Sequence, residues 1–123
     1  MPMQLQEIFV RLLAELSLKA NDRQAVLEAA AILQSRFPVQ RVVLFGSKAR
    51  GCDDAQSDID LLVLTSRPVA PSEKDRMTNA LFEIECKRAV VLNKFVVPLE
   101  QWERGLYRVL PIHAEVERDG VLA

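Results

Sequence analysis

The spacing of apolar and polar positions predicts two helices at the start of this chain. Between residues 5 and 16, apolar side chains recur every three or four positions and charged side chains fall largely on the opposite side. A second run of this period, over residues 26–37, predicts another helix, with Asn21 and Asp22 as its expected capping residues. Pro38 ends this helix, because the residue before a proline is disfavoured in helical geometry.

Three short apolar runs after Pro38 predict strands. Residues 42–45 and 59–64 are rich in β-branched and aromatic or leucine side chains, so we expect two buried strands at the centre of a sheet. Residues 89–97 predict a third strand. A helix with an apolar side precedes it, and Ser72 with Asp75 resembles an N-terminal cap for that helix.

The predicted order is helix, helix, strand, strand, helix, strand, helix, which indicates an α+β fold, an α/β sandwich with a small mixed sheet. The chain has 123 residues, 50% of them apolar. This length supports one core and therefore one domain, 1–123. Any larger function would require a partner or a homo-oligomer.

Charge and composition exclude several classes of function. The formal net charge of −1 argues against broad nucleic-acid binding, which requires a strongly basic face. No long uncharged apolar stretch predicts a membrane span or a signal peptide, so we expect a cytoplasmic protein. Cys52 and Cys86 lack zinc-site spacing, and His113 is the single histidine, so we expect reduced thiols and no structural zinc.

Candidate chemistry begins with two aspartates at the start of the second predicted strand. Asp58 and Asp60 are two residues apart, so their side chains project from the same face. Neighbouring carboxylates repel each other unless a cation lies between them, and oxygen-only ligands favour Mg²⁺ or Mn²⁺ over zinc. We therefore expect a metal site at these two residues.

A candidate phosphate site ends the first predicted strand. Gly46 allows close approach of a ligand to the backbone, and Ser47 offers a hydroxyl at the start of an expected helical turn. A phosphate site next to a metal site predicts displacement at a phosphate. Taken alone, a Gly-Ser pair is usually only a turn, and Lys48 or Arg50 is more simply a solvated charge.

The joint pattern resembles the minimal nucleotidyltransferases, small members of the DNA polymerase β-like superfamily. The resemblance rests on 46–51, Gly-Ser-Lys-Ala-Arg-Gly, and 57–63, Ser-Asp-Ile-Asp-Leu-Leu-Val, within a core of about 36–102. It implies the fold of that superfamily, here with an extra N-terminal helix in 1–20 and a C-terminal tail over 103–123.

The resemblance also implies roles for single residues. Gly46 and Ser47 would hold the nucleotide phosphates, Arg50 would lie near or contact them, and Asp58 and Asp60 would ligate Mg²⁺ or Mn²⁺. Members of the family transfer a nucleoside monophosphate from an NTP, here expected to be ATP, to a hydroxyl. Many are encoded beside a HEPN protein, and in some pairs the transferase is an antitoxin that adds AMP to that partner.

One position departs from the family pattern. Active members carry a third acid on the strand that follows the connecting helix, whereas 88–97 holds Asn93 and no carboxylate. An asparagine can coordinate a metal through its carbonyl but cannot accept a proton at neutral pH. Glu83, Glu85 and Glu100 flank this strand, and one of them would substitute for the third acid if the strand boundary lay elsewhere. A solvated helix face is the simpler interpretation of all three.

Two main hypotheses follow: a nucleotidyltransferase acting on a protein hydroxyl, or a weakly active or inactive binding module of the same fold that acts by complex formation. The neutral charge argues against a third, a nucleic-acid-modifying domain. Three further predictions concern residues outside the two motifs. His113 is expected on the surface or in the tail, and Cys52 beside the phosphate site is not expected to be a nucleophile. Trp102, Leu106 and Tyr107 either form a partner-binding patch or pack on the sheet.

Overall fold

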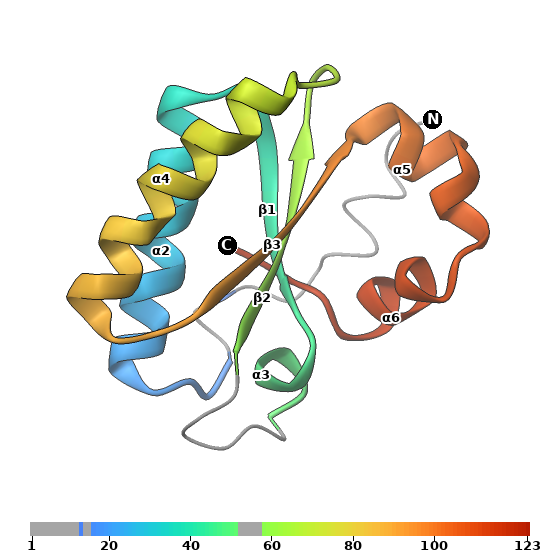
Figure 1. Cartoon of the computed structure of the whole chain (residues 1–123). Helices are drawn as coiled ribbons and strands as arrows, with labels where there is room; N and C mark the ends of the chain where they lie inside the picture. Colours follow the sequence, from blue (N-terminus) through green and yellow to red (C-terminus); the bar gives the residue numbers. More distant parts are fainter. Residues whose placement is uncertain (1–12, 14–15, 52–57) are drawn as a thin grey trace.

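The computed structural model describes residues 13, 16–51 and 58–123, and it places a sheet between two helical layers (Figure 1). Helices α2 (Ala20–Arg36) and α4 (Pro71–Arg88) cover one face. The other layer consists of α5 (Leu99–Arg104), the 3-10 helix η2 (Leu106–Val109) and α6 (Pro111–Asp119). The predicted α+β sandwich is therefore confirmed. Among the described residues, no helix is long and apolar enough to cross a membrane.

The sheet has four strands in the order β3-β2-β1-β4. They are β1 (Val39–Phe45), β2 (Ile59–Thr65), β3 (Leu92–Pro98) and β4 (Val121–Leu122). Strand β1 pairs antiparallel with β2 and with β4, whereas β2 and β3 are parallel. The sheet is mixed, and the two strands predicted to be central do occupy its centre.

Both faces of β1 and β2 are buried, because alternate side chains enter two separate cores. The core beneath α2 and α4 receives Val42, Leu44, Ile59, Leu61 and Val63 from these strands. The core beneath α5, η2 and α6 receives Val43, Leu62 and Leu64. This arrangement explains why the two strands are continuous apolar runs rather than alternating ones.

The N-terminal helix predicted over 1–20 lies largely outside the described residues, and the described residues 16–19 are not helical, so the helix does not extend over them. Within the described part, Leu13 and Leu16 are buried in the core beneath α2 and α4. The guanidinium of Arg23 donates hydrogen bonds to the carbonyl oxygens of both leucines. These two residues therefore complete the chain's own core.

Two local predictions around α4 are wrong. Ser72 and Asp75 do not cap α4; its N-cap is Ala70, whose N–H donates to Oε1 of Glu73 at 2.9 Å. The Arg67 guanidinium and this N–H lower the pKa of Glu73 to about 2. Strand β3 begins at Leu92 rather than at residue 89, because Ala89 adopts a left-handed conformation (φ 56°) that ends α4.

The C-terminal layer is organised around Trp102, which is 1% exposed. The ring of Trp102 stacks on His113 with a centroid distance of 4.5 Å and on Tyr107 at 6.4 Å. The expectation of a surface His113 is wrong, because this stacking and the packing of α6 bury it. Leu106 by contrast is 73% exposed, so only part of the predicted aromatic and apolar patch packs on the sheet.

We expect Trp102→Ala to lower the free energy of unfolding by about 3–5 kcal/mol, because it removes the ring that fills the second core. Leu106→Ala is the control on the neighbouring element, and its effect should stay within about 0.5 kcal/mol. Urea denaturation followed by circular dichroism measures both. Equal stability losses for the two variants would contradict the central role of Trp102.

Candidate functional site

The two aspartates predicted to bind a metal converge with Asn93 at one end of the sheet. Asp60 lies at the start of β2, in register with Asn93 on the parallel strand β3. Nδ2 of Asn93 donates to Oδ2 of Asp58 at 3.0 Å and to Oδ1 of Asp60 at 3.2 Å. Both carboxylates therefore accept a hydrogen bond from the same atom, Nδ2 of Asn93, and the three side chains form one polar cluster.

Gly46 lies directly against this cluster. The end of β1 pairs with the start of β2, with Phe45 opposite Asp60. A Cβ at Gly46 would lie 3.2 Å from Cγ of Asp60 and would collide with its Oδ2. Gly46 also has φ 79° and ψ −159°, a conformation that is essentially restricted to glycine. The structure thus brings the predicted phosphate turn and the predicted metal site together.

Ser47 opens the four-residue helix α3 (Ser47–Arg50), which lies at this end of the sheet (Figure 1). The Ser47 side chain is partly exposed, and Arg50 at the end of α3 is exposed. One guanidinium nitrogen of Arg50 lies 3.3 Å from Oε2 of Glu115 on α6. Arg50 therefore links α3 to the C-terminal layer. Ser57 and Cys52, near the same turn in the sequence, lie outside the described residues.

Lys48 and Asp22 are the residues that sequence reasoning misplaced. Lys48 is 2% exposed rather than solvated, and its Nζ lies 2.8 Å from Oδ2 of Asp22. Neither Asp22 nor Asn21 caps α2, because its N-cap is Lys19 and no side chain bonds there. The burial of Asp22 could have been predicted from the helical periodicity of α2. Asp22 falls on the same helical face as Ala25, Ala29 and Leu33, which is the buried face.

Both motifs lie within a stretch of the chain that matches a known protein family. A sequence model of the family described as "Nucleotidyltransferase domain" matches residues 26–120, which is most of the chain. The chain belongs to this family. The match contains Gly46, Ser47, Asp58 and Asp60, whose individual roles stay predictions. No curated protein matches the chain significantly.

Solved structures show the same fold at low sequence identity. One is the crystal structure of a toxin-antitoxin with AMP-PNP, at 15% identity, with a TM-score of 0.54 over 85% of this chain and 72% of that chain. Another is a Sulfolobus solfataricus protein classed provisionally as a nucleotidyltransferase, at 19% identity, with a TM-score of 0.50 over 86% of this chain and 87% of that chain. This nucleotidyltransferase domain thus has the fold that its motifs indicate.

None of the glutamates that flank β3 joins the two aspartates. Oε2 of Glu85 accepts the N–H of Leu92 at 2.8 Å, so Glu85 holds the start of β3. Glu100 is exposed on α5, which follows the far end of β3 from Asn93. Within the described residues, no group of three His, Cys, Asp or Glu could hold a metal ion. Asn93, in register with Asp60, lies on the strand where the family resemblance predicts a third acid.

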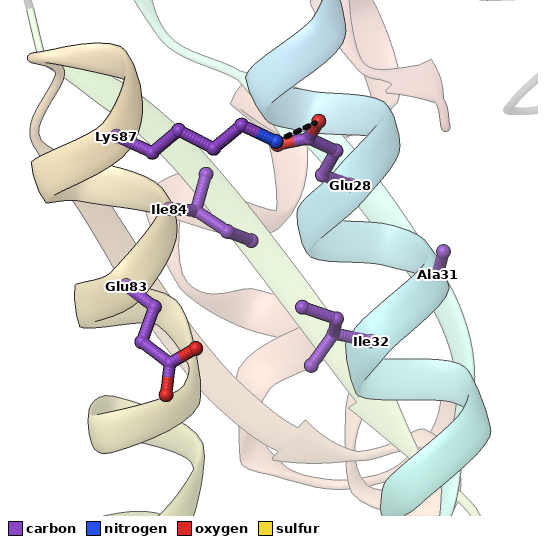
Figure 2. A pocket seen from close by; sticks show the side chains of 6 residues that line it. All are labelled: Glu28, Ala31, Ile32, Glu83, Ile84 and Lys87. Carbon is purple, nitrogen blue, oxygen red and sulfur yellow. Dashed lines mark hydrogen bonds and ion pairs between the residues drawn. The ribbon is translucent and has the colours of Figure 1, made fainter.

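Glu83 belongs to a different part of the surface. It lines a cavity of about 290 Å³ between α2 and α4, together with Glu28, Ala31, Ile32, Ile84 and Lys87. Figure 2 shows the side chains of Ile32 and Ile84 between the two helices, with the Glu28–Lys87 ion pair beside them. None of the residues predicted to bind nucleotide or metal lines this cavity.

Lys94 follows Asn93 but lies on the opposite face of β3, because side chains alternate along a strand. Its Nζ donates to Oγ1 of Thr78 on α4 at 2.6 Å. Burial lowers the pKa of Lys94, and the charges of Asp75 and Glu85 partly oppose this shift. Lys94 therefore belongs to the packing of α4 and not to the Asp58–Asp60 cluster.

We expect Gly46→Ala to destabilise the chain by about 3 kcal/mol or more, since the new methyl group collides with Asp60 and the backbone conformation excludes alanine. Gly51→Ala is a matched control, because Gly51 also has a positive φ (74°) but open space around it. That substitution should cost about 1–2 kcal/mol. Chemical denaturation of both variants checks this; equal losses would contradict the close approach of Gly46 to Asp60.

Proposed function

We propose that this nucleotidyltransferase domain binds ATP with Mg²⁺ at Asp58 and Asp60 and transfers AMP to a hydroxyl group of a protein partner. The observation that carries the proposal is the convergence of both carboxylates beside Gly46. Membership of the family supports the reaction class. The toxin-antitoxin structure of the same fold contains AMP-PNP, which supports an adenine nucleotide as the ligand.

The donor set fits a hard divalent cation. Asp58 and Asp60 supply carboxylate oxygens that meet within hydrogen-bond distance of one point, and the Asn93 amide offers a carbonyl oxygen if its plane rotates. Mg²⁺ commonly uses one or two carboxylates and completes its shell with water and phosphate oxygens. When bound, it would neutralise charge on the phosphates and lower the pKa of the attacking hydroxyl.

The surrounding residues define what the chain itself contributes. Gly46 has no side chain between its backbone and Asp60, and the Ser47 hydroxyl can donate to a phosphate oxygen. In the transfer, the acceptor oxygen bonds to the α-phosphorus, the bond to the β-phosphate oxygen breaks, and pyrophosphate leaves. The acceptor proton passes to solvent water, because Asn93 cannot take it at neutral pH. We therefore expect slow transfer.

A protein of the HEPN type is the acceptor that we propose. The toxin-antitoxin neighbour supports a protein partner. The chain also exposes apolar side chains on η2, with Leu106 73% and Val109 77% exposed. Exposed neighbouring apolar residues are typical of protein contact surfaces.

We expect the wild-type chain to bind Mg²⁺-ATP in calorimetry, and Asp60→Asn to weaken this binding at least about tenfold, since even indirect partners of a metal contribute that much. Glu100→Gln removes an exposed carboxylate elsewhere and should leave the affinity unchanged. Transfer is followed with ATP labelled at the α-phosphate, Mg²⁺ and the protein encoded beside this chain. No label on that protein, or equal labelling by Asp60→Asn, would refute the proposed reaction.

Asn93 favours a second candidate function, a binding module of the same fold that acts by complex formation. Its amide N–H₂ bonds to both carboxylates and so stabilises the cluster without a cation. In this case Asp60→Asn would leave complex formation and neutralisation of the partner unchanged.

The substitution Asn93→Asp separates the two candidates. If the chain is a slow transferase, the added carboxylate should raise the transfer rate by about 10²-fold, a typical contribution of a positioned base. It should also make thermal stability more dependent on Mg²⁺, because three carboxylates then meet without the amide. Asn79→Asp adds the same charge at an exposed position of α4 and serves as the control. An unchanged rate in Asn93→Asp would favour the binding module.

A further inference from the structure

A buried ion pair joins the candidate phosphate turn to helix α2. Nζ of Lys48 and Oδ2 of Asp22 are 2.8 Å apart, and the two side chains are 2% and 10% exposed. The residues are 26 positions apart in the sequence, so the pair is a tertiary contact. It connects the first turn of α2 with the residue that directly follows Ser47.

Helix α3 depends on such contacts for its position. It has four residues, and two backbone hydrogen bonds at this turn are long: the Arg50 N–H to the Gly46 carbonyl oxygen at 3.2 Å and the Gly51 N–H to the Lys48 carbonyl oxygen at 3.3 Å. A single helical turn is unstable by itself, because nucleation costs more than so few hydrogen bonds return. Burial of Ala49 and Lys48 therefore fixes where the turn lies.

The other end of the ion pair is itself well anchored. Next to Asp22, Arg23 bonds to the carbonyl oxygens of Leu13 and Leu16. Nδ2 of Asn21 donates to the carbonyl oxygen of Arg88 at the end of α4 at 2.8 Å. Asp22 thus projects from a helical turn that is held on two sides. This turn precedes residue 26, where the match to the nucleotidyltransferase family begins.

Burial of this pair has a cost that favours a positioning role. Removing two charges from water is expensive, and apolar side chains of similar volume often stabilise a fold equally well or better. A buried charge-assisted hydrogen bond instead supplies direction and a defined distance. Here the hydrogen bond connects Asp22, in the anchored turn of α2, with Lys48, which directly follows the Gly46–Ser47 turn.

We propose that Asp22 and Lys48 are positioning residues for nucleotide binding: their ion pair holds the Gly46–Ser47 turn at the location where it can contact the phosphates. This inference rests on the proposed function, since it names the Gly46–Ser47 turn as the phosphate contact. Neither side chain is placed in contact with the nucleotide. Their effect is exerted through the position of α3.

Two isosteric variants test the proposal, Asp22→Asn and Lys48→Met. The first readout is amide hydrogen exchange at Arg50 and Gly51, which needs no ligand. Exchange should accelerate about tenfold or more in both variants, because charge-assisted hydrogen bonds contribute at least that factor to such equilibria. The second readout is the Kd for Mg²⁺-ATP, measured where each variant is fully folded, which should rise by a similar factor.

The control is Met77→Ala, a cavity-forming substitution in α4 that destabilises the core without removing the pair. It should leave exchange at Arg50 and Gly51 and the Kd unchanged under folding conditions. If a single variant fails to fold, the double variant Asp22→Leu/Lys48→Met replaces it, because it removes both charges of the pair together. Its α3 amides should still exchange faster than those of the wild type.

The outcomes separate this inference from the proposed function. Wild-type exchange at Arg50 and Gly51 in the variants overturns the inference, whatever the nucleotide affinity. Faster exchange with a wild-type Kd overturns it too, because the turn would then move without consequence for binding. If the wild-type chain binds no Mg²⁺-ATP, the proposed function fails, and the positioning role for nucleotide fails with it, even where exchange shows that the pair holds the turn.

Discussion

Backbone pairing at one end of the sheet brings the candidate site together. Phe45 at the end of β1 pairs with Asp60, and Asp60 lies in register with Asn93 on β3. Ladder hydrogen bonds set this geometry, and they do not depend on the side chain at each position. The site therefore keeps its shape although an amide stands where an acid is expected. Gly46 fits there because it has no side chain to meet Asp60.

The Asn93 amide connects the two candidate functions physically. Two carboxylates at close range repel each other, and the amide N–H₂ compensates by donating to both. An asparagine at position 93 offers no proton acceptor, and its amide lets the two carboxylates lie together without a cation. Under the proposed function, the residue at position 93 would therefore set the rate of transfer, because it would be the missing proton acceptor.

Helix α3 is contacted from both sides of the sheet. Lys48 reaches α2 through the buried pair with Asp22, and Arg50 reaches Glu115 on α6. Helices α2 and α6 lie on opposite faces of the sheet (Figure 1), so these two contacts connect one short turn to both helical layers. The position of Ser47 therefore depends on both helical layers, although neither layer contributes a residue to the Asp58–Asp60 cluster.

Sequence alone determined most of the local elements and the motif residues, but not strand β4 or the caps of α2 and α4. Continuous apolar runs indicated β1 and β2, because buried strands show no polar alternation, and the two-residue spacing of Asp58 and Asp60 placed both carboxylates on one face. The start of β3, the burial of His113 and the partner of Lys48 depended on the tertiary structure. Each is decided by contacts between separate elements: Glu85 of α4 with Leu92 of β3, Trp102 of α5 with His113 of α6, and Asp22 of α2 with Lys48 of α3. Local pattern specifies conformation and faces, but a charged side chain is buried only where the fold supplies its partner.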